Sequence, residues 1–108
     1  MGAVAYVNGR YCALGYDNGR GRALGQAAVN VEDRGFQFGD GIYEVVYVRD
    51  GRLIDAPLHM ARLQRSLREI DILLPLSSAA LEVVMREVLR RNRISTGLVY
   101  LQISRGVA

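Results

Sequence analysis

His59 and Arg62 are the first candidates for chemistry in this sequence. They stand three residues apart, so on a helix they share one face. An arginine fork suits phosphate, and the start of a helix carries a partial positive charge, so the pair could hold an anion. The alternative is a surface arginine beside a lone histidine, and the spacing alone leaves both interpretations open.

Two tyrosines and a glycine-rich segment are the next candidates. Tyr43 and Tyr100 lie in segments expected to be strands, where an apolar ring with a polar tip serves either a ligand or plain packing. Gly35–Gly41 allows close approach of the backbone to a ligand, and the alternative is a tight turn before a strand. It lacks the third glycine and the preceding strand of a dinucleotide fingerprint. Cys12 has no histidine near it in sequence, so we expect a small apolar residue there and not a nucleophile.

The elements that must position these residues begin with a hairpin. Asn8-Gly9 predicts it over Val4–Tyr11, because both turn residues tolerate positive φ. Leu14–Gly25 contains four glycines and is expected to be an exposed, mobile loop.

A second hairpin is expected around a longer strand. Ile42–Val48 is rich in β-branched and aromatic residues, and an Asp50-Gly51 turn leads into Leu53-Ile54. Alternation along the strand divides its side chains between two faces. One face carries Tyr43, Val45 and Tyr47, and the other carries Ile42, Glu44, Val46 and Val48. Both faces are largely apolar, which favours a central strand.

Two helices and a last strand follow. Pro57 suits the first turn of one helix, and Ser77 or Ser78 can cap the other. Apolar residues recur at helical spacing in both. In Leu98–Ser104 every second residue is apolar, which predicts a strand. Strands and helices are segregated along the chain, so we predict an α+β fold: a mostly antiparallel sheet with two helices packed on one face.

Composition excludes several classes of protein. The 108 residues suffice for one small domain, and no apolar run is long enough for a transmembrane span. All 14 basic residues are arginines, so no residue here can form a Schiff base or act as a catalytic amine. One cysteine and no visible secretory signal favour the cytoplasm.

The net charge of +3 raises the question of nucleic-acid binding. The densest basic stretch, Arg86–Arg93, has Glu82 four residues before Arg86 and Glu87 four before Arg91. This order favours ion pairs along a solvated helix. No aromatic residue interleaves with the patch, so we expect no nucleic-acid partner.

Three segments together carry a recognisable pattern. They are Val31–Val46 (VEDRGFQFGDGIYEVV), His59–Leu63 (HMARL) and Thr96–Gly106 (TGLVYLQISRG). In this order they resemble the N-terminal domain of D-amino-acid aminotransferases, which are class IV (fold type IV) pyridoxal-phosphate enzymes. The likeness covers about residues 29–108 and the opening hairpin.

The resemblance implies roles for five residues. In the family, the arginine matching Arg62 clamps the cofactor phosphate, and the tyrosine matching Tyr43 helps orient the substrate carboxylate. Glu44 and Val45 match positions that line the same pocket, and Tyr100 matches an aromatic residue near it. The family's Schiff-base lysine has no counterpart in this chain, so the 108 residues alone are expected to be inactive.

For the intact enzyme, the resemblance implies a homodimeric transferase that uses pyridoxal 5′-phosphate and acts on amino-acid and 2-oxo-acid substrates. We expect no metal site and no membrane partner. Residues 1–108 would be its small N-terminal domain, without the C-terminal domain that bears the lysine. Tyr43–Val46 favours the D-amino-acid branch, since branched-chain aminotransferases and aminodeoxychorismate lyases usually carry phenylalanine-glutamate there. Those two relatives and a non-enzymatic α+β interaction module remain as alternatives.

Overall fold

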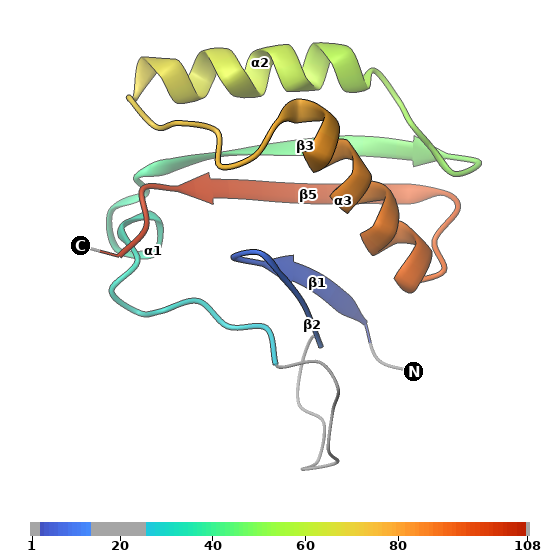
Figure 1. The fold of residues 1–108 in the computed structure, drawn as a ribbon, viewed down its shortest axis with the longest axis horizontal. Helices are drawn as coiled ribbons and strands as arrows, with labels where there is room; N and C mark the ends of the chain where they lie inside the picture. Colours follow the sequence, from blue (N-terminus) through green and yellow to red (C-terminus); the bar gives the residue numbers. More distant parts are fainter. Residues whose placement is uncertain (1–2, 14–25, 108) are drawn as a thin grey trace.

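The computed structural model of this chain describes residues 3–13 and 26–107. Within them the elements follow one another as β1 (Val4–Val7), β2 (Arg10–Ala13), α1 (Arg34–Phe38), β3 (Gly41–Arg49), β4 (Arg52–Leu53), α2 (Ala56–Glu69), α3 (Ser78–Arg91) and β5 (Gly97–Ser104) (Figure 1). The loop expected over Leu14–Gly25 lies outside the described residues. Antiparallel strands segregated from helices confirm the predicted α+β class.

Both predicted hairpin turns are confirmed. β1 pairs with β2 across Asn8 and Gly9, which have φ angles of 49° and 88°. β3 pairs with β4 across Asp50 and Gly51, with φ angles of 51° and 75°. Positive φ at both central residues gives the turn a twist that matches the strands, and Asn-Gly and Asp-Gly adopt it at low cost.

β3 and β5 form the long antiparallel ladder of a sheet ordered β4-β3-β5. The register runs from Gly41 opposite Ser104 to Val48 opposite Gly97. Residues opposite each other in such a ladder share a face of the sheet. The two predicted faces of β3 are therefore continued by the two predicted faces of β5.

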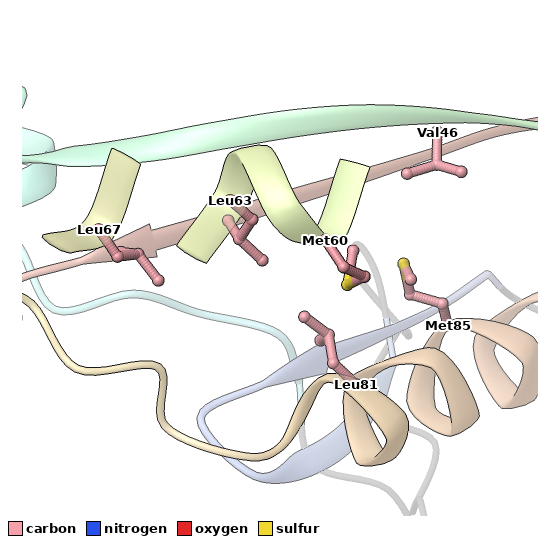
Figure 2. Packing of buried hydrophobic residues seen from close by; sticks show 6 residues of the cluster. All are labelled: Val46, Met60, Leu63, Leu67, Leu81 and Met85. Atoms are coloured by element: carbon pink, nitrogen blue, oxygen red, sulfur yellow. The ribbon is translucent and has the colours of Figure 1, made fainter. Parts of the chain in front are cut away.

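The helices α2 and α3 pack their apolar sides on one face of this sheet, as predicted. Side chains from both helices meet the β3 side chain of Val46 in a buried cluster (Figure 2). Burial of each of these side chains stabilises the fold by about 1.5–3 kcal/mol. The helical members of the cluster are Met60, Leu63 and Leu67 of α2 and Leu81 and Met85 of α3.

The ends of the helices follow the sequence signals. Ser77 is the N-cap of α3, and its hydroxyl accepts a bond from the N–H of Ala80 at 3.1 Å. Pro57 lies in the first turn of α2, where its missing N–H is not needed. None of the helices in the described residues has both the length and the apolar character needed to cross a membrane.

The short helix α1 was not predicted, since Gly35–Gly41 was expected to be a tight turn or a loop near a ligand. Asp33 caps this five-residue helix by accepting the N–H of Gly35 at 2.8 Å. Gly39 ends it in the left-handed conformation, with φ of 64°. A Cβ on Gly35 would stand 2.5 Å from the Cβ of Ser104, so this glycine is needed for close packing against β5.

Candidate functional site

Glu44 is a buried carboxylate at the centre of a small polar network. Its residue is 6% exposed and lies on the helix-covered face of β3. Its Oε2 accepts the Nε–H of Arg62 at 2.8 Å, and its Oε1 accepts an N–H of Nη2 at 2.8 Å. Nδ1 of His59 lies 2.7 Å from the same Oε1. The predicted pair of His59 and Arg62 is thus joined by a carboxylate from a strand.

The helix α2 positions both partners of this carboxylate. It packs against β3 through the apolar side chains of the core, and this fixes its rotation about its own axis. Because His59 and Arg62 are three residues apart, both then point toward Glu44. The His59 side chain is 17% exposed, whereas that of Arg62 is 56% exposed and reaches solvent.

The electrostatics keep Glu44 ionised. The hydrogen bonds from Arg62 lower the pKa of the Glu44 carboxyl the most, and the bond from His59 lowers it further, while burial opposes both. The carboxylate in turn raises the pKa of Arg62. An ionised Glu44 can only accept, so Nδ1 of His59 carries the proton that it shares with Oε1.

Arg62 has N–H donors that Glu44 does not use. A guanidinium has five N–H donors, two of them point to Glu44, and three remain. Those three lie on a side chain that is more than half exposed. The arrangement suits a bound oxyanion such as phosphate, which takes planar arginine donors well.

A second group of predicted residues lies on the opposite face of the sheet. The rings of Tyr43 and Tyr100 stack there with centroids 5.7 Å apart. Val45 lies directly across the ladder from Tyr100 and shares this face. The hydroxyl of Tyr100 donates to Oε1 of Gln102 at 3.1 Å. The structure therefore brings Tyr43, Val45 and Tyr100 together and separates them from Glu44 and Arg62 by the thickness of β3.

The edge of β3 that faces away from β5 is only partly paired with another strand. In the described residues β4 covers that edge only at Val48 and Arg49, and Ile54 adds one bond to the carbonyl of Tyr47. The backbone groups of Tyr43 and Val45 face the same edge as those of Tyr47, because such groups alternate along a strand. In Figure 1, α2 lies on this side of β3, away from β5.

The other residues singled out from the sequence, Cys12 and the charged residues of α3, make contacts within the protein itself. Cys12 is buried, as expected, and its thiol donates to the carbonyl of Arg10 at 3.5 Å. The ion pairs predicted along α3, Glu82–Arg86 and Glu87–Arg91, are present at 3.2 Å and 2.7 Å. Arg90 and Arg91 together hold the pKa of Glu87 at about 2. No group of three or more His, Cys, Asp or Glu side chains that could hold a metal occurs in the described part of the chain.

Sequence reasoning missed the link from Glu44 to Arg62 and two further arginine contacts. Arg34 donates to the carbonyls of Arg105 at 2.9 Å, Gly106 at 3.0 Å and Val107 at 3.2 Å. Arg105 pairs with Asp40 at 2.6 Å. The sequence did contain one indication of the partner of Glu44. A carboxylate among the apolar residues of a strand face requires a charged or hydrogen-bonding partner once it is buried.

Comparison with known proteins identifies the family of this chain. The model of the family described as amino-transferase class IV matches residues 41–108. A protein named D-alanine aminotransferase from Listeria monocytogenes serotype 4b is 44% identical over 81 residues, which is 75% of this chain and 28% of that protein. The chain thus spans about a third or less of the curated relatives it matches.

Solved structures agree with this match. A 4-amino-4-deoxychorismate lyase from Pseudomonas aeruginosa is 30% identical, with a TM-score of 0.62 over 79% of this chain and 30% of that one. A hypothetical aminotransferase from Mycobacterium tuberculosis, solved in a form with pyridoxal phosphate bound, is 28% identical, with a TM-score of 0.64 over 86% of this chain and 31% of that one. On the match of residues 41–108, this chain belongs to the class IV aminotransferase family.

Proposed function

We propose that this chain is the small domain of an enzyme that transfers an amino group between a D-amino acid and a 2-oxo acid with pyridoxal 5′-phosphate as cofactor. The observation that carries the proposal is the likeness to D-alanine aminotransferases, at 44% identity over 81 residues. The geometry of Arg62 and of the tyrosine pair is compatible with it. The domain boundary at residues 1–108 and the cytoplasmic location belong to the same proposal.

The donor chemistry around Arg62 fits the phosphate of this cofactor. Three N–H donors of Arg62 remain beyond its two bonds to Glu44, and the side chain is 56% exposed. We assign Arg62 as the residue that binds the phosphate. When bound, pyridoxal phosphate supplies an electron sink for chemistry at the amino-acid α-carbon.

The aromatic face supplies the substrate contacts in this proposal. Tyr43 is 64% exposed, and we assign its hydroxyl to a hydrogen bond with the substrate carboxylate. Tyr100 stacks on the ring of Tyr43, and Val45 lies opposite Tyr100 on the same face. A charged substrate group held by oriented donors is fixed in position for reaction.

The lysine that this chemistry requires must come from outside these residues. The 108-residue sequence contains none. We therefore propose that the residues described above bind and orient, while proton transfer by a lysine takes place on another part of the enzyme. The isolated 108 residues are expected to show no turnover, and the complete enzyme is expected to be a homodimer.

A panel of substrates tests this function on the protein as encoded by its gene. The protein is purified with pyridoxal phosphate and mixed with D-alanine and 2-oxoglutarate. The expected result is a visible absorbance band of bound cofactor and formation of pyruvate and D-glutamate in equal amounts. Turnover of L-leucine in place of D-alanine would instead identify a branched-chain aminotransferase. Absence of cofactor binding would overturn the proposal and leave a non-enzymatic module.

The second candidate is a lyase acting on aminodeoxychorismate. It is favoured by the structural likeness to the Pseudomonas aeruginosa lyase, at 30% identity. A lyase cleaves its substrate without a 2-oxo-acid acceptor. Product from aminodeoxychorismate in the absence of 2-oxoglutarate, together with no product from D-alanine, would select this candidate.

A further inference from the structure

We propose that Glu44 is a positioning residue that orients the guanidinium of Arg62 for a phosphate, and that His59 holds Glu44 in place. The proposal rests on the function assigned to Arg62 above. It replaces the expectation that Glu44 lines the substrate pocket. The basis is the pair of bonds from Glu44 to Nε and Nη2 of Arg62, both 2.8 Å long.

The two bonds fix the plane of the guanidinium. Arginine has a long flexible side chain, and a single bond would leave its head free to rotate. A bidentate contact defines both the plane and the edge that faces the carboxylate. The opposite edge, at Nη1, then points in one direction only. Such preorganisation removes an entropy cost from ligand binding.

The carboxylate itself is held rigidly. Glu44 is 6% exposed and stands on β3, between the buried Val46 and the helix-facing Ile42. His59 adds a third contact at 2.7 Å on Oε1, the oxygen that also accepts from Nη2 of Arg62. Glu44 of β3 and His59 and Arg62 of α2 therefore hold one another in fixed positions. A site whose side chains are supported in this way keeps its geometry.

Charge alone predicts the opposite effect of Glu44 on phosphate affinity. A carboxylate beside Arg62 weakens the positive potential that attracts an anion. If Glu44 acted only through its charge, its removal would strengthen phosphate binding. If it orients Arg62, its removal weakens phosphate binding. Whether phosphate affinity rises or falls when Glu44 is replaced therefore distinguishes the charge effect from the positioning effect.

The test compares two probes, pyridoxal 5′-phosphate and pyridoxal, which differ only in the phosphate. Dissociation constants are measured on the gene-encoded protein and on Glu44→Gln, which has nearly the same volume but no charge. We expect the Kd of pyridoxal phosphate to rise about tenfold, because charge-assisted bonds that hold the fork are lost. The Kd of pyridoxal should change less than twofold. Glu82→Gln is the matched control, since Glu82 pairs with Arg86 at 3.2 Å on the exposed side of α3, and it should change neither constant.

A double-mutant cycle with Arg62→Ala completes the test. Once Arg62 is absent, Glu44→Gln should add no further loss of phosphate affinity. Additive losses, an equal rise in the Kd of both probes, or a fall in the Kd of pyridoxal phosphate would each overturn the positioning role. If Arg62→Ala alone leaves both constants unchanged, the assignment of Arg62 to the phosphate is wrong, and the positioning role falls with it.

If Glu44→Gln does not fold, His59→Gln is the variant that tests the proposal. It removes one contact to Oε1 and leaves the two bonds between Glu44 and Arg62 in place. A smaller rise in the Kd of pyridoxal phosphate, about twofold to fivefold, is expected with no change for pyridoxal. An unchanged Kd for both probes would contradict the role assigned to His59 and, with it, the proposal that these three side chains hold one another in place.

Discussion

Tyr43 and Tyr100 stack across the β3–β5 ladder, with ring centroids 5.7 Å apart and planes 19° from parallel. They are diagonal neighbours, since Tyr43 lies opposite Gln102 and Tyr100 lies opposite Val45. Diagonal positions on one face of a sheet are within reach of aromatic side chains. The stack fixes the ring of Tyr43 while its residue stays 64% exposed, so its hydroxyl remains available.

The hydroxyl of Tyr43 is expected to contribute to substrate binding and not to folding. Among the hydrogen bonds of residues 3–13 and 26–107, none involves it. Tyr43→Phe keeps the stacked ring and removes one donor to a carboxylate. We expect the KM for D-alanine to rise about tenfold with an unchanged Kd for pyridoxal phosphate. Steady-state kinetics measure the first and a binding titration the second.

Tyr47→Phe is the control for this variant. Tyr47 lies on the same face of β3 and is 66% exposed, but no role in the site is assigned to it. Its KM for D-alanine should match that of the unmodified protein. A KM that responds equally to both variants would remove Tyr43 from the substrate site.

Arg34 is expected to hold the chain that follows β5. It donates to three successive carbonyls, those of Arg105, Gly106 and Val107. Arg34→Lys keeps the charge, but a lysine lacks the planar fork that reaches three acceptors. The free energy of unfolding should fall by about 1 kcal/mol, since the contacts are partly exposed.

Amide hydrogen exchange measures this local effect. The N–H groups of residues 105–107 should exchange faster in Arg34→Lys, while the amides of α3 keep their protection. Arg49→Lys, at the exposed end of β3, is the matched control. Unchanged exchange at residues 105–107 would show that the arginine does not restrain this segment.

Local signals in the sequence predicted most of the fold. Asn8-Gly9 and Asp50-Gly51 each demand a turn with positive φ, and each forms one. The period-two pattern of Ile42–Val48 assigned every side chain to its observed face. These predictions succeed because the deciding interactions lie within a few residues of one another.

The polar networks could not be predicted in the same way. Glu44 is 15 residues from His59 and 18 from Arg62, and Arg34 is 71 to 73 residues from the carbonyls it binds. No local preference specifies such partners, which are set by how β3 packs against α2 and β5. The helix α1 was missed for a different reason: Asp33 and Gly39 are local cap signals, but five residues are too few for a helical period to show.

Gly35 is expected to be intolerant of a side chain. A Cβ at this position would stand 2.5 Å from the Cβ of Ser104. Gly35→Ala should therefore lower the free energy of unfolding by about 1–3 kcal/mol through overpacking. Urea denaturation measures the loss. Gly97→Ala is a milder control, since its nearest contact would be 3.2 Å from a side-chain methyl of Ile94.

Coupling to Ser104 identifies the cause. Ser104→Gly removes the atom that clashes, although it also removes the 2.6 Å bond from the Ser104 hydroxyl to Asp33. The double variant should lose less stability than the sum of the single variants. Strictly additive losses of unfolding free energy would mean that Gly35→Ala destabilises α1 itself and does not act through the packing of α1 against β5.

The ionisation of Glu44 makes stability depend on pH in a defined direction. Hydrogen bonds from Arg62 lower the pKa of Glu44 in the folded protein below its usual value of 4.5. Above that value the carboxyl is ionised in both the folded and unfolded states, and its contribution to stability is complete. As the pH falls below it, the unfolded chain takes up the proton first, so unfolding becomes easier until the folded pKa is passed. The gap in urea midpoint between the unmodified protein and Glu44→Gln should therefore narrow as the pH falls below 4.5. A gap that does not narrow below pH 4.5 would mean that the pKa of Glu44 is not lowered in the folded protein and that Glu44 does not pair with Arg62 as an ion.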